Sequence, residues 1–280
     1  MALTVASVVL TVVAGIAIFA DARVLTGVPI WLKPFKFAVS FIVYAWTLAW
    51  LLAILPRRSR TGEVAAIVIV GVAVVELTVI VTQVIRGTTS HYNVATPLDA
   101  TLWAVMGTSI MVLFFAHLAI GVVALIQRIP DRPAAYAIRL GMLIALGGMA
   151  LGFVMTGGNS GAGAHSVGVP DGGPHMPVTG WSTLGGDLRI SHFVGLHALQ
   201  AVPLLAYALG RWTRFGEAVR VRLVMVGGGA YGVLVMLLLW QALRAQPLLR
   251  PDGLTLAAFA ALAVATVAAS AIVIKTGVRR

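Results

Sequence analysis

The sequence of 280 residues contains no cysteine and few charged residues. The absence of cysteine excludes disulfides, thiolate-bound iron–sulfur clusters, covalently attached c-type haem and a cysteine nucleophile. Only 10% of the residues are Asp, Glu, Lys or Arg, whereas an ordinary soluble domain has about 25%. A chain that is also 60% hydrophobic cannot cover its own surface in water. We therefore expect lipid to be its solvent.

Familiar catalytic and nucleotide-binding motifs are also absent from the sequence. It contains no Walker-type loop, no GxSxG, no HExxH and no dinucleotide-binding fingerprint. Ser191 and His192 are adjacent and would point about 100° apart on a helix, which argues against a hydrolase pair. The net charge of +11 comes from basic residues in short clusters between apolar segments. This placement indicates topology signals and contacts with anionic lipid, and it argues against nucleic-acid binding.

Long apolar segments dominate what is present. Each is close to the roughly 20 residues that a helix needs to cross the hydrocarbon layer, and such unbroken runs favour helices over the alternating strands of membrane barrels. The segments cover residues 2–20, 31–55, 63–85, 102–126, 134–156, 190–209, 222–243 and 254–274. The sequence predicts an all-α polytopic transmembrane bundle of about eight helices, forming a single integral membrane domain over residues 1–280.

The first apolar segment has an alternative interpretation as a cleaved signal peptide. Ala20 and Ala22 would form the small-residue cleavage site. Against this, the segment lacks a basic region at its start, and its apolar stretch is longer than usual. We expect residues 2–20 to remain as a helix.

The Lys and Arg residues predict the orientation of the helices. One set of alternate loops holds thirteen of them: Arg57, Arg58, Arg60, Arg128, Arg132, Arg139, Arg211, Arg214, Arg220, Arg222, Lys275, Arg279 and Arg280. The other side holds seven: Arg23, Lys33, Lys36, Arg86, Arg189, Arg244 and Arg250. Cytoplasmic loops carry the excess of basic residues. The count predicts a multi-pass protein of the cell membrane with both termini in the cytoplasm.

Two loops on the predicted outer side differ from the short connectors on the inner side. Residues 86–101 read RGTTSHYNVATPLDAT, and residues 157–189 form a long, glycine-rich segment. A connection of that length without secondary-structure signals is usually functional or disordered. Trp181 and two His-containing stretches bounded by prolines predict partial order in the longer loop, such as a lid over the bundle.

Ionisable residues inside the apolar segments predict a site in the outer half of the bundle. Glu76 falls near the middle of its segment, and Gln83 and Arg86 follow on the same side of the helix. Lys36 is expected roughly 8 Å below the surface, at 1.5 Å per residue, within reach of Glu76. Charges at such depth are expected to face the bundle and to have partners. We assign Glu76 and Lys36 as candidate catalytic residues that relay protons or tune charge; alternatively, Glu76 is only the structural partner of a lysine.

Histidines provide the second part of this candidate site. On the sixth segment, His192 is expected about 3 Å and His197 about 10 Å below the surface, and Gln200 shares a face with His197. Imidazole is the commonest ligand of copper, zinc and iron. His197, His192 and His91 are therefore the candidate ligands of a transition metal or haem b.

Three further residues are the candidate contacts of a cofactor, namely Arg86, Arg189 and Gln200. Loop histidines such as His165 and His175 are expected to be solvated. His117 lies on the inner side of its segment and is expected to be a hydrogen-bonded core residue.

Three functions fit this pattern. The first is a membrane-bound redox protein or enzyme that uses the His-ligated metal or haem. The second is a transporter of a small solute or of protons, in which the outer basic residues form a vestibule and Glu76 is the coupling site. It requires a polar path to the cytoplasm, for which the inner half offers little beyond His117 and Tyr44. The third is a non-catalytic subunit or sensor that docks a partner or assembles as an oligomer.

Overall fold

The computed structural model describes residues 2–156 and 164–278, and within these ranges almost all regular structure is helical. The expected all-α fold is confirmed. Contacts divide the chain into two compact units, residues 1–123 and 124–280. The expectation of a single membrane domain stays a prediction.

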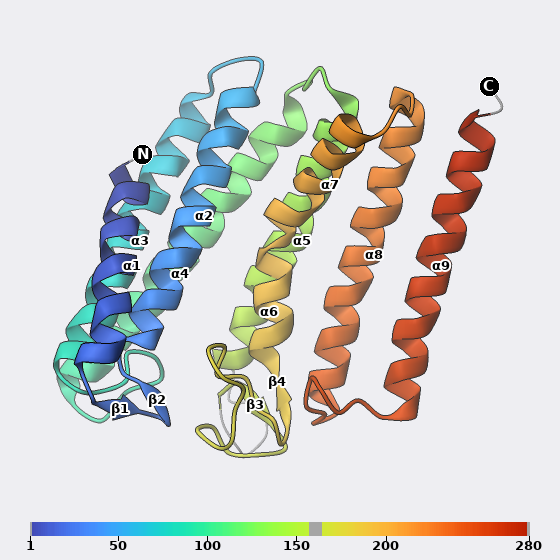
Figure 1. Ribbon diagram of the computed structural model, residues 1–280. Coiled ribbons are helices and arrows are strands. Elements are labelled where there is room, and N and C mark those ends of the chain that lie inside the picture. The colour runs from blue at the N-terminus through green and yellow to red at the C-terminus, as the bar shows by residue number, and fades with distance from the viewer. Residues whose placement is uncertain (1, 157–163, 279–280) are drawn as a thin grey trace. The chain divides into compact units, whose positions relative to one another are not determined.

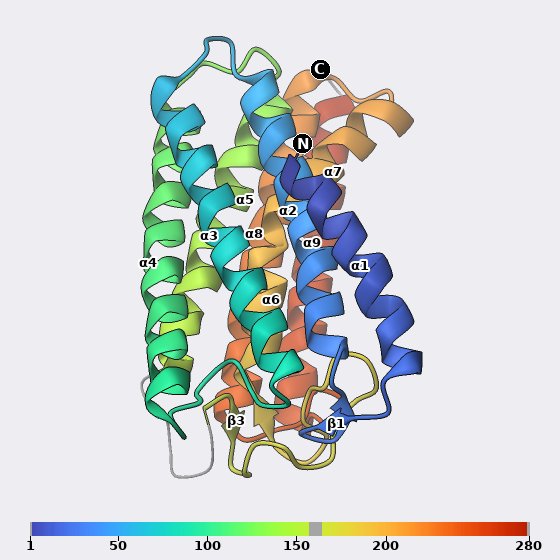
Figure 2. The same ribbon diagram turned by 90° about the vertical axis from the view of Figure 1, so that its left-hand side faces the viewer.

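Unit 1 contains four long helices that run side by side (Figures 1 and 2). Their bounds are α1 Ala2–Ala20, α2 Leu32–Ile54, α3 Arg60–Ile85 and α4 Pro97–Ile126, the last turn of α4 reaching into unit 2. A short antiparallel ribbon joins α1 to α2, with β1 Val24–Leu25 paired to β2 Val28–Pro29. This ribbon and the α3–α4 loop lie at the same end of the unit. The first apolar segment is confirmed as a helix.

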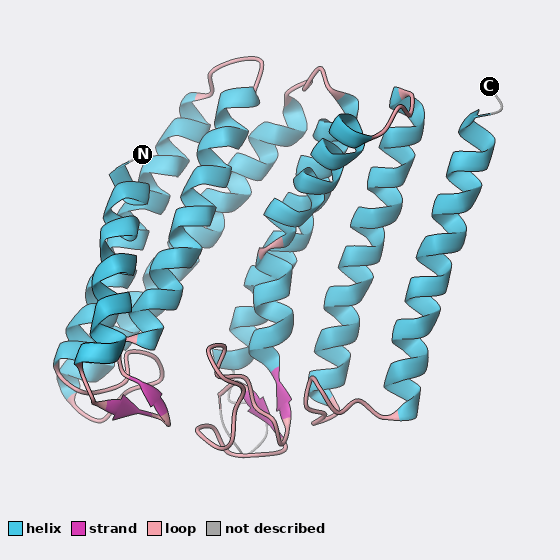
Figure 3. Ribbon diagram, in the orientation of Figure 1, coloured by secondary structure: helices cyan, strands magenta, loops and turns pink. Residues whose placement is uncertain are grey.

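Unit 2 contains the remaining helices and a second two-stranded ribbon. The helices are α5 Arg132–Thr156, α6 Leu188–Leu196, α7 Ala198–Trp212, α8 Glu217–Leu243 and α9 Gly253–Val278. The strands are β3 Ser166–Val167 and β4 Gly186–Asp187, which pair antiparallel. Figure 3 shows that the strands of both units are confined to the connections between helices. In the long loop, residues 164–187 are described and contain this ribbon, which agrees with the expected partial order; residues 157–163 lie outside the described residues.

Seven helices of the described chain are long and apolar enough to cross a membrane. They are α1, α2, α3, α4, α5, α8 and α9, and they coincide with seven of the eight apolar segments of the sequence. The segment predicted over 190–209 is instead a pair of helices, α6 and α7, bent by 46° at a break. Taken as one span, this pair would be the eighth.

Close backbone packing of glycines accompanies this bend. A Cβ atom added to Gly148 of α5 would lie 2.6 Å from the carbonyl carbon of Gly195, so the two helices meet at a distance that only glycine permits. Pro203, inside α7, removes an amide donor and crowds the carbonyl one turn earlier. The bend at His197 falls between these two features. Small residues at a helix interface are the usual means of close packing in membranes.

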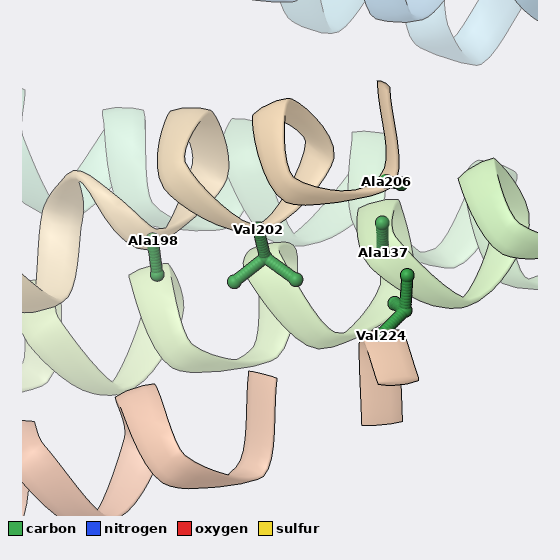
Figure 4. Packing of buried hydrophobic residues seen from close by; sticks show 5 residues of the cluster. All are labelled: Ala137, Ala198, Val202, Ala206 and Val224. Carbon is green, nitrogen blue, oxygen red and sulfur yellow. The ribbon is translucent and has the colours of Figure 1, made fainter. Parts of the chain in front are cut away.

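On the α7 side of the bend, α5, α7 and α8 are held together by a cluster of small and branched side chains. Figure 4 shows its buried members, which are Ala137, Ala198, Val202, Ala206 and Val224. Helix association in lipid relies on such van der Waals contact, because lipid tails are as apolar as the side chains. This cluster packs α7 against α5 and α8 directly after the break at His197.

Candidate functional site

Glu76 lies near the middle of α3 and is buried, with 1% of its surface exposed. The hydroxyl of Ser109 on α4 donates a hydrogen bond of 2.6 Å to its Oε1 atom. Lys33, in the first turn of α2, lies close enough to interact electrostatically with the carboxyl group. Three helices of unit 1 thus contribute to the surroundings of Glu76. Lys36, the partner that the sequence suggests, lies half-buried one turn further along α2, and its role stays a prediction.

Lys33 also connects this carboxyl group to the α3–α4 loop. Its Nζ atom lies 3.1 Å from Nδ1 of His91. An ammonium group has only hydrogens to donate, so Nδ1 is the acceptor and the ring proton belongs on Nε2. Burial, together with the charge of Lys33, holds the pKa of His91 well below its usual value of 6.5. His91 is therefore neutral near neutral pH.

Aromatic rings enclose His91. The centroids of Phe37, Tyr92 and Trp103 lie 5.8, 6.3 and 5.5 Å from that of the imidazole. Phe37 and Trp103 also pack against an apolar cluster of Val79, Ile80 and Met106. The imidazole and the lysine thus lie in a largely apolar environment, which strengthens their electrostatic interaction.

A second polar network lies where α3 ends and α4 begins. Asp99, 3% exposed, accepts hydrogen bonds from Gln83 at 2.8 Å and from Arg86 and Thr96 at 2.6 Å each. Thr96 also accepts a bond from the backbone N–H of Asp99, which caps the start of α4 beside Pro97. Arg86, expected to contact a cofactor, thus forms an ion pair within the protein.

The residues of this cap also form a sequence pattern that predicts the start of α4. A Thr followed by Pro and, three residues on, by an acidic residue is a typical helix N-terminus. The hydropathy pattern placed the start at residue 102, five residues after the observed Pro97. The predicted boundary therefore leaves Asp99 in the loop, whereas the structure places it in the first turn of α4.

Tyr44 and His117 form a third polar contact, further along α2 and α4. The tyrosine hydroxyl lies 2.8 Å from Nδ1 of His117, and the two rings stack. His117 is 1% exposed, and its Nε2 atom is buried with no hydrogen-bond partner among the residues that the structure describes. The expectation of a hydrogen-bonded core histidine is confirmed.

In unit 2, Arg189 stabilises the end of the long loop. It forms an ion pair of 2.6 Å with Asp187, which is the N-cap of α6. The same guanidinium donates to the carbonyl oxygen of Gly180 at 2.5 Å, and Ser182 donates its backbone N–H to Asp187 at 2.9 Å. Within this network Arg189 has a structural role, and its proposed contact with a cofactor stays a prediction.

The two histidines of the bent helix pair α6–α7 differ in their surroundings. Nδ1 of His192, on α6, lies 2.7 Å from the carbonyl oxygen of Gly148. A carbonyl can only accept, so this nitrogen carries the proton and Nε2 keeps its lone pair. His197 stands at the break and is exposed, with Nδ1 3.2 Å from Oε1 of Gln200. Both rings therefore have one nitrogen oriented by the protein.

The other loop histidines have partners near them in sequence. Nδ1 of His165 lies 3.1 Å from Asp171, and Nδ1 of His175 lies 2.9 Å from the carbonyl oxygen of Gly173. Among the described residues, no group of three or more His, Cys, Asp or Glu side chains comes together in a way that could hold a metal ion. His91 belongs to unit 1 and His192 and His197 to unit 2, so the three-histidine site stays a prediction.

Comparisons with protein-family models, with curated proteins and with solved structures give no match to this chain.

Proposed function

We propose that the chain is a multi-pass protein of the cell membrane, with about eight spans and cytoplasmic termini, that transports a small solute and couples this transport to protons at Glu76. One observation carries the proposal: a carboxyl group buried near the middle of a membrane-length helix, bonded to Ser109 of a neighbouring helix. Ionisable groups at this depth are costly and usually belong to ion or proton pathways.

The surroundings of Glu76 suit a group that changes its charge. As a carboxylate it is balanced by Lys33 and by the Ser109 hydroxyl. As a carboxylic acid it no longer needs the positive charge, and the ammonium group keeps His91 as its acceptor. The lysine thus has a partner in either state. Such an arrangement lowers the cost of moving a proton on and off Glu76.

His91 connects the Lys33–Glu76 region to the α3–α4 loop at one end of unit 1. It belongs to the α3–α4 loop, and its Nδ1 accepts from Lys33. Arg86 and Arg189 are each paired with an aspartate, so they contribute less free positive charge to a vestibule than the sequence suggests. The solute is therefore expected to interact with the Lys33–Glu76 region and not with a ring of free arginines.

The proposal is tested by proton flux into proteoliposomes, driven by a potassium diffusion potential and followed with a pH-sensitive dye. Glu76→Gln, which keeps the shape of the side chain, should abolish the protein-dependent flux. Glu63→Gln, on the exposed first turn of the same helix, is the matched control and should leave the flux unchanged. Equal flux in wild type and Glu76→Gln would contradict the proposal.

A second candidate, a redox protein or enzyme with haem b or a transition metal, is favoured by the orientation of His192. Metal-binding histidines commonly donate the proton of their second nitrogen to a carbonyl group, as His192 does to Gly148. His192 and His197 would be the ligands from unit 2. An absorption spectrum with elemental analysis of purified protein tests this candidate. A Soret band or bound metal that His192→Ala removes and His175→Ala retains would support it; no band and no metal would exclude it.

A further inference from the structure

A groove of about 530 Å³ runs between α3 and α4 of unit 1. It begins at Arg60 and Thr61, in the first turn of α3, and extends along apolar side chains to Val68. On α4 it is lined by Val112 and Phe115. Eight residues of helix correspond to about 12 Å along the membrane normal. The groove therefore covers the part of the span nearest the start of α3.

The chemistry of the groove differs between its two ends. Its walls are apolar, with Val64 and Phe115 exposed on the surface. Its mouth carries Arg60, and Arg57 and Arg58 lie in the preceding connection. Glu63 is the acidic residue of this region, so three arginines and one glutamate leave two net positive charges. An occupant that matches both ends has an apolar chain and a negative head.

We infer that this groove binds one anionic phospholipid, with an acyl chain between α3 and α4 and the phosphate headgroup at Arg60. In a bilayer, an acyl chain gains little by leaving one apolar environment for another. Selectivity of the groove for one lipid over another must therefore come from the headgroup. Guanidinium groups bind phosphate oxygens through paired hydrogen bonds, and basic residues next to spanning helices select anionic lipids.

The site is independent of the proton site at Glu76. It is built on the first turns of α3, whereas Glu76 lies sixteen residues after Arg60 on the same helix. Glu76→Gln should leave lipid binding unchanged. Loss of lipid binding should in turn leave the Glu76–Ser109 hydrogen bond intact.

The inference is tested by native mass spectrometry of the full chain in detergent, titrated with phosphatidylglycerol or with phosphatidylcholine of the same acyl chains. Wild type should bind phosphatidylglycerol at least about fivefold more tightly, the factor expected for one basic residue at the membrane surface. Arg60→Gln should weaken phosphatidylglycerol about fivefold and leave phosphatidylcholine unchanged. Val64→Trp, which fills the groove, should weaken both lipids.

Two control variants separate this site from general lipid contact. Arg128→Gln removes an exposed arginine from another connection on the same predicted side, and Val74→Trp adds the same bulk at an exposed position of α3 outside the groove. Both should bind lipid as wild type does, and unfolding temperatures confirm that each variant folds. Equal affinity of wild type for the two lipids, equal effects of Arg60→Gln and Arg128→Gln, or a groove occupied by a second copy of the chain would each overturn the inference.

Discussion

The hydroxyl of Ser109 donates a 2.6 Å hydrogen bond to Oε1 of Glu76, joining α4 to the middle of α3. The bond serves a carboxyl group of which only 1% of the surface is exposed, and a buried acceptor that loses its donor is costly. Ser109 therefore both fixes the position of Glu76 and lowers the cost of burying it. Removal of the Ser109 hydroxyl should therefore affect both the stability and the function of the protein.

Ser109→Ala should lower the free energy of unfolding by about 1–2 kcal/mol, because Glu76 loses its hydrogen-bond donor. The measurement is reversible unfolding in mixed micelles, followed by circular dichroism. Ser109→Thr keeps the hydroxyl and is the control. The same stability for Ser109→Ala and wild type would show that the bond makes no net contribution.

Asp99→Ala should destabilise the protein by about 2–4 kcal/mol. The substitution leaves Arg86 and the buried Gln83 without their common acceptor and removes the carboxylate partner of Thr96 in the cap of α4, and a buried polar group that loses its partner is costly. The comparison is Glu63→Gln, which breaks an exposed ion pair of 3.9 Å with Arg58 and should cost less than about 1 kcal/mol. Equal effects of the two substitutions on unfolding would contradict the ion-pair network described for Asp99.

His91 should make stability depend on pH. Burial and the charge of Lys33 lower its pKa in the folded protein, while in the unfolded chain the pKa is about 6.5. Below that pH the unfolded state binds the proton and the folded state does not. The resulting stabilisation is complete above pH 6.5 and decreases as the pH falls toward the folded pKa, by up to about 1.4 kcal/mol per pH unit.

His91→Gln is the variant that tests this dependence. The glutamine keeps an acceptor for Lys33 but does not titrate in this range. The free energy of unfolding of the variant should therefore decrease less as the pH falls below 6.5, by up to about 1.4 kcal/mol per pH unit less than in wild type. Unfolding temperatures of both proteins between pH 8 and pH 5 provide the measurement. Parallel curves for the two proteins would show that His91 is not the titrating group.

Gly148→Ala should destabilise unit 2 strongly, by about 1–3 kcal/mol or more. A Cβ atom at this position would lie 2.6 Å from the backbone of Gly195, so α5 and α6 would have to separate. Gly147→Ala is a matched control one residue away, where a Cβ meets nothing within 4 Å. It should be neutral or slightly stabilising, because alanine favours the helix. Similar unfolding temperatures for the two variants would contradict the close packing.

The membrane-length helices could be predicted from the sequence because hydropathy is a local property. Seven apolar segments match seven helices to within a few residues. The two largest deviations, of five residues each, are at the starts of α4 and α8. The one at α4 has a local cause, since the Thr96–Asp99 cap extends the helix beyond the apolar run.

The partners of the candidate residues could not be predicted in this way. Ser109 follows Glu76 by thirty-three residues, and their contact depends on how α3 and α4 are aligned along their length. The same holds for the ion pair of Arg86 and Asp99, and the expected contact of Arg86 with a cofactor stays a prediction. A sequence shows the depth of a residue in its own helix but not the residue that it faces.

By itself, the sequence determined the apolar character of the chain and the approximate limits of seven long helices, because a run of apolar residues in lipid must satisfy its backbone hydrogen bonds within one helix. It also indicated that Glu76 lies deep in a helix. Only the tertiary structure decided that Glu76 meets Ser109 and Lys33, that Asp99 gathers Gln83 and Arg86, and that the sixth span bends at His197. The physical reason is that these features depend on contacts between helices, which are set by small residues and side-chain packing over the whole length of each pair.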